Sequence, residues 1–523
     1  MIRTPYRLTR RGLLGHGLAA GGLAALPATR ALAQTSDEGG RLRARLYADI
    51  QNLDPAFWTS ASDALVMECI YAFAMQFETG TDQFTAQPVA FSRIEQVDDT
   101  HIEFELHEGI MYSGDYGEMT AEDVKFSYER IADPEVDSPY AEDWAQLDHV
   151  EVTGKYSGTI VLKAPFAPLF NSTLPATSGI ILPQAAIEAA GGQFTTEPPV
   201  YSGPYRIRSW EPRTRVVLER NPDFTLFEVE FDEIELIPIE DPKTAELGFE
   251  AGDIDHAQTS ISSMARYAET PPARGSFQRF TGLNYYWLGM NEGNADLADQ
   301  NIRRAIQHGI SREAVVEAAY LGAAEPAAGI IAPGLTGHRE ANLYDYDPER
   351  ARQLLDEAGA SGLRVSLAIQ QTAEDLAAAQ VIQALLADIG VMVQIDQYES
   401  GTFWSLGVES EGDQWRDLQL FLFSFTMQPD PSWATVWFTP AQVGVWNWQR
   451  FDNAEYAELH RAAASELDTE ARAEMYVRMQ DLMEESGDFV FLTFEPVGIL
   501  TADGVEDAMR PDGTPILPRF TRS

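Results

Sequence analysis

Alternating apolar and polar positions predict short strands along much of the chain. The segments 101–106 ("HIEFEL"), 215–220 ("RVVLER") and 232–239 ("DEIELIPI") alternate as half-buried strands do. Two further segments, 283–291 ("LNYYWLGMN") and 489–500 ("FVFLTFEPVGIL"), are rich in aromatic residues and show little polar alternation. That pattern is typical of strands buried on both faces.

Apolar residues spaced three or four apart predict helices between these strands. In "MTAEDVKFSYERI", Thr120 is expected to cap a helix, with Asp123 completing a capping box. In "YDYDPERARQLLDEAG", Asp347 is the expected N-cap, Pro348 is the first helical residue and Gly359 ends the helix. Helical and strand patterns alternate without a repeat, so we predict a mixed α/β fold.

The first 33 residues predict a cleaved export signal. They contain the pair Arg10–Arg11, a short apolar run and an Ala-x-Ala site that ends at Ala33. The apolar run is well short of the ~20 residues that a membrane-spanning helix needs. Because paired arginines are typical of the twin-arginine route, we expect a periplasmic protein. The single cysteine, Cys69, lies far from the cleavage site, so neither a lipoprotein nor an internal disulfide is expected.

The amino-acid composition limits the kinds of molecule that the protein is expected to bind. The formal net charge is −44, and the five arginines of the predicted signal leave the remainder still more acidic. Phosphate binding needs a basic surface, so nucleic acid is excluded as a partner. The charge favours a solvated acidic surface, with attraction of a cationic ligand as the alternative.

The sequence contains no recognisable catalytic or metal-binding motif. The eight histidines are scattered, and H-E-x-x-H, G-x-S-x-G, a Walker loop and a dinucleotide fingerprint do not occur. We therefore predict a binding protein rather than an enzyme, with no cofactor and no metal.

Several segments, in their order along the chain, resemble one known family. They include "NLDPAFWTSASD", "FELHEGIMYSGDYGEMTAEDVKFSYERI", "PVYSGPYRIRSWEPRTRVVLERNPDF", "ELGFEAGDID" and the "QPDP" turn. The chain resembles the extracytoplasmic solute-binding proteins of family 5, the periplasmic components of dipeptide, oligopeptide and nickel ABC importers. The resemblance implies a two-lobed, periplasmic-binding-protein-like fold of type II, in the large variant with an inserted subdomain. Two crossing strands form its hinge.

The resemblance also implies where the lobes begin and end. Lobe I is expected to comprise residues 34–58, 172–282 and 495–523, and an inserted subdomain of lobe I is expected at 59–171. Lobe II is expected at 283–494.

The family's ligand-facing loops map onto two places in lobe I. In lobe II, an aromatic-rich stretch from Phe403 to Trp448 is expected to replace the family's ionic contacts with the ligand. In lobe I we expect hydroxyls and backbone amides to bind ligand, at Trp58, Thr59, Ser60, Tyr201, Ser202 and Gly203. In lobe II the expected ligand-binding residues are Phe425, Met427, Asp430, Trp433, Trp446 and Trp448.

Two features of the lobe II stretch set the expected chemistry. Peptide-binding members carry an aspartate that pairs with the ligand's α-ammonium, and the corresponding position here is Met427. The segment 445–451 ("VWNWQRF") is predicted as a strand, in which Trp446 and Trp448 share one face and Asn447 points to the other.

The resemblance implies a monomeric receptor that delivers a small organic solute to the transmembrane subunits of an ABC permease. A peptide or peptide-like compound is the leading expectation for the ligand. An oligosaccharide, an opine-like conjugate or a cationic amine are the alternatives within this class. An enzyme or a periplasmic chaperone that reuses the fold is the alternative from another class.

Overall fold

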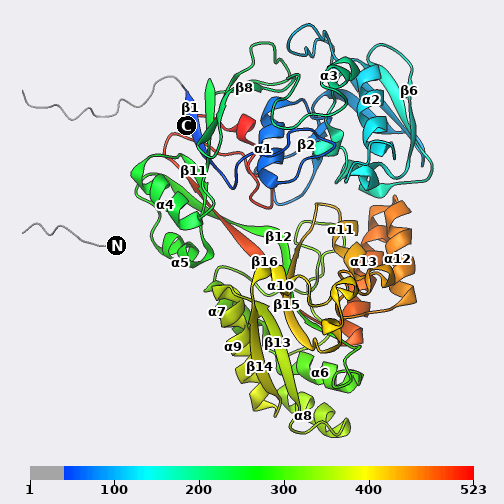
Figure 1. The fold of residues 1–523 in the computed structure, drawn as a ribbon, viewed down its shortest axis with the longest axis vertical. Helices are drawn as coiled ribbons and strands as arrows, with labels where there is room; N and C mark the ends of the chain where they lie inside the picture. The colour runs from blue at the N-terminus through cyan, green and yellow to red at the C-terminus, as the bar shows by residue number, and fades with distance from the viewer. Residues whose placement is uncertain (1–39) are drawn as a thin grey trace, which may run out of the picture. The chain divides into compact units, whose positions relative to one another are not determined.

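The computed structural model describes residues 40–523, and a ten-stranded mixed sheet is its main feature (Figure 1). In sheet order the strands are β14 (Met392–Tyr398), β13 (Arg364–Gln370), β15 (Leu420–Thr426), β12 (Ser276–Met290), β16 (Phe489–Thr501), β11 (His256–Gln258), β1 (Arg41–Leu46), β10 (Glu233–Pro238), β9 (Arg215–Arg220) and β8 (Tyr205–Glu211). The predicted α/β class is confirmed. The export signal predicted for residues 1–33 lies outside the described residues.

Two smaller antiparallel sheets lie between residues 75 and 162. One pairs β2 (Met75–Phe77) with β3 (Ala86–Pro88), and the other has the order β4 (Phe91–Gln96), β5 (His101–Leu106), β7 (Ser157–Leu162) and β6 (Leu147–Val152). The strands predicted at 101–106 and 215–220 are β5 and β9, with the predicted bounds.

Thirteen α-helices connect the strands of the described residues. They are α1 (Ala61–Ile70), α2 (Ala121–Ala132), α3 (Gln184–Ala189), α4 (Pro242–Ala251), α5 (Ile261–Glu269), α6 (Gln300–Gly309), α7 (Arg312–Tyr320), α8 (Pro348–Glu357), α9 (Ala373–Asp388), α10 (Ser400–Phe403), α11 (Ser432–Thr435), α12 (Ala454–Ser465) and α13 (Thr469–Ser486). Within residues 40–523, none of them has both the length and the apolar composition to cross a membrane.

The predicted helix caps are confirmed. At the start of α2, the Asp123 carboxylate accepts a hydrogen bond from the Thr120 amide at 2.7 Å. At the start of α8, Asp347 accepts from the backbone amides of the first turn, and Pro348 is the first helical residue. Gly359, just after the helix, has a φ of +66°, which glycine adopts without strain.

Two long strands, β12 and β16, run through the sheet as its hinge. They pair antiparallel from Ser276 opposite Thr501, and the register is broken between Thr281 and Tyr285. Gly282 lies at this break, where a Cβ atom would come within 2.6 Å of the Glu495 carbonyl oxygen. The expected hinge of two crossing strands is therefore present, and a glycine allows the strands to approach closely at its centre.

The sheet separates two hydrophobic layers around β12. Tyr286 and Leu288 pack with residues of α6, α7, α8 and α9, whereas Tyr285 and Trp287 pack with aromatic residues and with α12 and α13. A further core joins residues of β1, α1, α2 and the four-stranded sheet with the C-terminal segment, including Phe520. From Gly282 to Met290, β12 is therefore largely buried on both faces, as predicted for 283–291, whereas its first six residues are exposed or half-buried.

The buried histidine of β11, His256, should make the free energy of unfolding depend on pH. His256 is 4% exposed and contacts the ring of Phe520, and burial lowers its pKa to about 4. In the unfolded chain this histidine binds a proton near pH 6.5. The stability that the buried neutral ring contributes is therefore fully present above about pH 6.5, and it is lost as the pH falls below that value. Relative to a His256→Gln variant, the wild type should lose about 2 kcal/mol more between pH 7.5 and pH 5.

Urea unfolding of both proteins at the two pH values measures this difference. The comparison with the variant removes the contribution of the many carboxylates, because these are shared. Asp507 opposes the shift by favouring the charged ring. An equal change in the two proteins would mean that His256 does not carry this pH dependence.

Candidate functional site

Five partly exposed aromatic rings form one surface around the end of β15. We call this surface the aromatic platform; its members are Trp404, Phe425, Trp433, Trp437 and Trp446. Each ring centroid lies within 6.4 Å of another member's centroid. Aromatic faces bind apolar and ring-containing ligand groups, so the platform is a candidate binding site.

Strand register explains how Phe425 reaches the platform. It lies opposite Tyr285 of β12, and opposed residues of an antiparallel pair share one face of the sheet. Phe423, two residues earlier on that face, is buried, whereas Phe425 is partly exposed. Beyond the strand, α11 and the 3-10 turn after it place Trp433 and Trp437 beside each other, with ring centroids 6.3 Å apart.

The rings of the platform lie in two orientations. Trp404 and Phe425 are nearly parallel, with an angle of 14° between their planes. Trp446 stands across its neighbours, at 73° to Trp404, 83° to Phe425 and 77° to Trp437. The surface therefore contains both stacked and edge-to-face ring pairs, the two arrangements that aromatic groups prefer.

The strand predicted for residues 445–451 is wrong. This segment forms turns, because the buried Asn447 side chain donates to the carbonyl oxygens of Phe438 and Phe451, at 3.2 and 2.8 Å. Trp446 and Trp448 consequently do not share a strand face. Trp446 belongs to the platform, whereas Trp448 is 2% exposed and packs in the core beneath it.

Two other expected ligand residues of this stretch are also buried. The Asp430 carboxylate is fully buried and accepts two hydrogen bonds from the Arg472 guanidinium, at 2.8 and 2.9 Å, and one from the Ser432 hydroxyl at 2.6 Å. Met427 is 2% exposed and lies in the aromatic core. In this conformation Asp430 stabilises the turn, and neither side chain faces solvent.

The expected loop at the start of α1 offers one unsatisfied donor. Trp58 stacks on Tyr140, with ring centroids 4.9 Å apart and planes 3° from parallel. Its indole Nε1 is buried and has no hydrogen-bond partner among the described residues. Thr59 is exposed, and Ser60 caps α1 in a capping box with Asp63.

The second expected loop is mainly structural. Tyr201 is partly exposed, but the Ser202 hydroxyl is buried and accepts from the Ala72 amide at 3.0 Å. The Gly203 amide donates to the Ile70 carbonyl at 2.9 Å, and a Cβ at Gly203 would lie 2.5 Å from the Ile70 carbonyl carbon. The turn is thus held against the end of α1, with Tyr201 as its accessible member.

Comparison with protein families decides the family of this chain. A family model described as bacterial extracellular solute-binding proteins, family 5, matches residues 85–444. This chain belongs to family 5.

Relatives of this family 5 protein come from several bacteria. A Brucella ovis protein named as an ABC transporter peptide-binding protein is 26% identical over 62% of this chain, and the match spans 63% of that relative's length. The glutathione-binding protein GsiB of Salmonella typhimurium is 24% identical over 75% of this chain and 77% of its own. The crystal structure of the ABC transporter substrate-binding protein CtaP of Listeria monocytogenes superposes with a TM-score of 0.81 at 17% identity, covering 92% of this chain and 99% of that one. The last comparison shows the shared fold, and with it the expected two-lobed architecture is confirmed.

Three titratable side chains in the segments around the platform of this family 5 protein are paired or neutral. Asp430 pairs with Arg472, and Arg450 pairs with Glu409 at 2.7 Å. Burial lowers the pKa of His460 to about 4, so its ring is neutral at neutral pH. In the described part of the chain, no cluster of histidine, cysteine, aspartate or glutamate is arranged to hold a metal ion. The platform can bind by contact with rings but brings no free charge of its own.

Trp404 and Trp437 belong to the platform but were not among the expected ligand-binding residues. Both occur in the aromatic-rich stretch, but no local pattern separates them from buried neighbours such as Phe403 and Phe438. Trp404 directly follows the four-residue helix α10 and is partly exposed. Such a short element leaves no periodicity to read.

Proposed function

We propose that this protein is the solute receptor of an ABC importer, which captures a small organic solute and delivers it to the permease. The observation that carries the proposal is the aromatic platform, which lies beside a two-strand hinge in a chain of family 5. A ligand that contacts both lobes would favour their closure, because it binds the closed state better. The receptor itself performs no chemistry.

The proposed lobes follow the hydrophobic cores. We place lobe I at residues 34–58, of which the structure describes 40–58, and at 172–282 and 495–523. The inserted subdomain is placed at 59–171 and lobe II at 283–494. One core draws on residues from Leu42 to Leu236 and on the C-terminal segment, in support of lobe I. The two layers around β12 draw on residues from Leu283 to Phe494, in support of lobe II.

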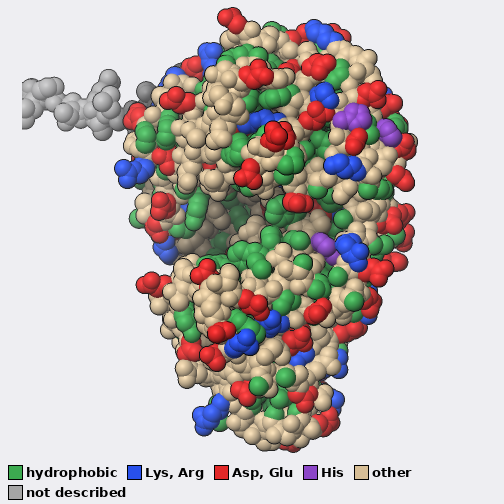
Figure 2. Space-filling view, turned by 45° about the vertical axis from the view of Figure 1, so that its right-hand side comes forward, with side chains coloured by type: hydrophobic (Ala, Val, Ile, Leu, Met, Phe, Trp, Pro, Cys, Tyr) green, Lys and Arg blue, Asp and Glu red, His purple; other side chains and the backbone are tan. Residues whose placement is uncertain are grey.

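The proposed location is the periplasm, reached by the twin-arginine route, and the proposed state is a monomer. Acidic side chains are spread over the face in Figure 2 rather than gathered in one patch, in support of a solvated acidic surface. The same face is hollowed near its middle, where hydrophobic side chains are visible.

A peptide or peptide-like compound is the first candidate ligand, because the relatives above are named for peptide and glutathione binding.

A thermal-shift screen of the purified, ligand-stripped protein tests the proposal. Di- to pentapeptides, oligosaccharides, opines and polyamines form the panel. A ligand at 100 times its Kd should add about 2.7 kcal/mol to the free energy of unfolding and raise the melting temperature by a few degrees. Conversion of a bound compound into a product would indicate an enzyme. Binding of many unfolded proteins without one saturable ligand would indicate a chaperone.

A further inference from the structure

Four rings of the platform contact one another and remain partly exposed. Phe425 contacts Trp404, Trp437 and Trp446, with centroid distances of 6.4, 5.9 and 5.9 Å. All four side chains remain partly exposed, so their rings are not fully covered by the protein. Aromatic rings contact one another most favourably at centroid distances of this size, in offset or edge-to-face arrangements.

Two charged side chains in the segment that carries the platform, Asp430 and Arg450, are paired within the protein. A carboxylate at the hinge, Glu495, accepts from the Asn284 side chain at 2.9 Å. Successive strand residues point to opposite faces, so Asn284 and Glu495 lie on the face of β12 away from Tyr285 and the platform. A carboxylate that meets only the rings of the platform would lose water without gaining an opposite charge, and an ammonium would gain only cation–π attraction.

From these contacts we infer that the platform is a side-chain subsite for an uncharged aromatic residue of a short peptide ligand, and that it binds neither terminus of that peptide. The inference rests on the proposed function and narrows its ligand class. Other atoms of the peptide must find partners elsewhere.

Titration calorimetry with matched tripeptides tests the inference. The probes carry Phe, Leu, Lys or Glu at each position of an otherwise all-alanine tripeptide, and each is also made with an acetylated amino terminus. At the best position, Phe should bind at least about tenfold more tightly than Lys or Glu. Acetylation of that peptide should change its Kd by less than about threefold, because the platform holds no ammonium.

Two variants separate the platform from the overall fold. Trp446→Ala should remove most of the preference for Phe over Lys, whereas Trp446→Phe should retain it because a ring remains. Trp210→Ala is the matched control: Trp210 is also partly exposed, but it lies on β8 at the far edge of the sheet, where its Nε1 donates to Asp49 at 3.0 Å. The control should bind like the wild type.

Three results would overturn the inference while leaving the proposed function intact. They are a preference for Lys or Glu peptides, a loss of more than about a hundredfold on acetylation, and saturable binding of a neutral oligosaccharide but of no peptide. An unchanged preference in Trp446→Ala would also place the aromatic subsite elsewhere. If no compound of any class binds, the proposed function itself fails.

Discussion

An Arg472→Met variant should unfold with a free energy about 3 to 5 kcal/mol lower than that of the wild type. The Arg472 side chain is 5% exposed, and its guanidinium donates two hydrogen bonds to the fully buried Asp430 carboxylate. It also donates to the Ala463 carbonyl at 2.8 Å and the Tyr476 hydroxyl at 3.0 Å. Methionine fills similar space but leaves the carboxylate buried without its partner. Urea unfolding followed by circular dichroism measures the loss.

Arg478 on the same helix, α13, provides the matched control. Its guanidinium pairs with Glu455 at 2.8 Å and Glu485 at 2.9 Å, but its side chain is 39% exposed. Arg478→Met should therefore cost at most about 1 kcal/mol. A double variant, Asp430→Leu with Arg472→Met, should recover much of the loss, because no unpaired charge remains buried. Equal losses from the two single arginine variants would contradict this account.

Local patterns predicted much of the fold, because the signals lie within a few residues of one another. Alternation over six residues was sufficient for β5 and β9, and the Asp347–Pro348 start was sufficient for α8. The strand predicted at 283–291 is the buried half of β12, whose other half begins at Ser276. From Ser276 to Thr281 the apolar and polar residues alternate less clearly, and these residues are exposed or half-buried.

The candidate site was less predictable, because distant partners decide which side chains are buried. Asp430 was an expected ligand-binding residue, but its carboxylate pairs with Arg472, which lies 42 positions later in the chain. The sequence predicted the same role for Trp446 and Trp448. The hydrogen bonds of the Asn447 side chain hold the segment in turns instead, and Trp448 is buried in the core. The spacing of apolar residues along the chain does not reveal such contacts between distant residues.

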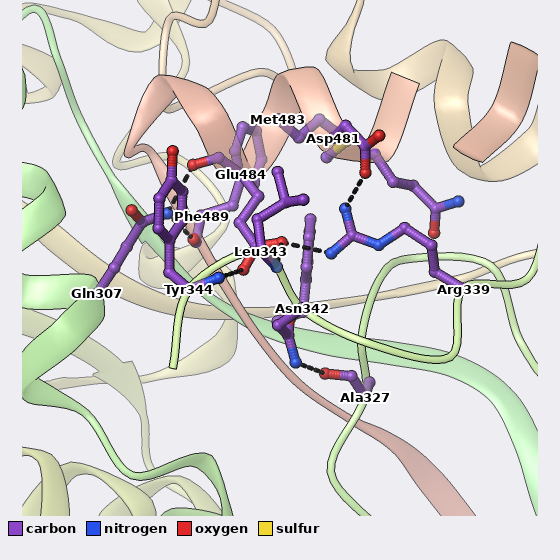
Figure 3. A network of polar contacts seen from close by, with 12 residues as sticks. Gln307, Ala327, Arg339, Asn342, Leu343, Tyr344, Asp481, Met483, Glu484 and Phe489 are labelled. Atoms are coloured by element: carbon purple, nitrogen blue, oxygen red, sulfur yellow. Dashed lines mark hydrogen bonds and ion pairs between the residues drawn. The ribbon is translucent and has the colours of Figure 1, made fainter. Parts of the chain in front are cut away.

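A Glu484→Gln variant should also lose about 3 to 5 kcal/mol of unfolding free energy. The Glu484 carboxylate is fully buried on α13 and forms an ion pair with Arg312 at 3.2 Å. It forms a second ion pair with Arg339, which Figure 3 shows. It also accepts from the backbone amides of Leu343 and Tyr344, at 2.9 and 3.4 Å. Glutamine keeps the shape but removes the negative charge, and its amide nitrogen would face groups that are themselves donors.

The neighbouring Glu485 is the control for this change. Its side chain is 42% exposed and pairs with Arg478 at the surface, so Glu485→Gln should cost at most about 1 kcal/mol. Hydrogen exchange gives a second, local readout. In Glu484→Gln the amides of Leu343 and Tyr344 should exchange faster than in the wild type, because the carboxylate that accepts them is gone. If stability fell but these amides kept their protection, the loss would not arise from the contacts in Figure 3.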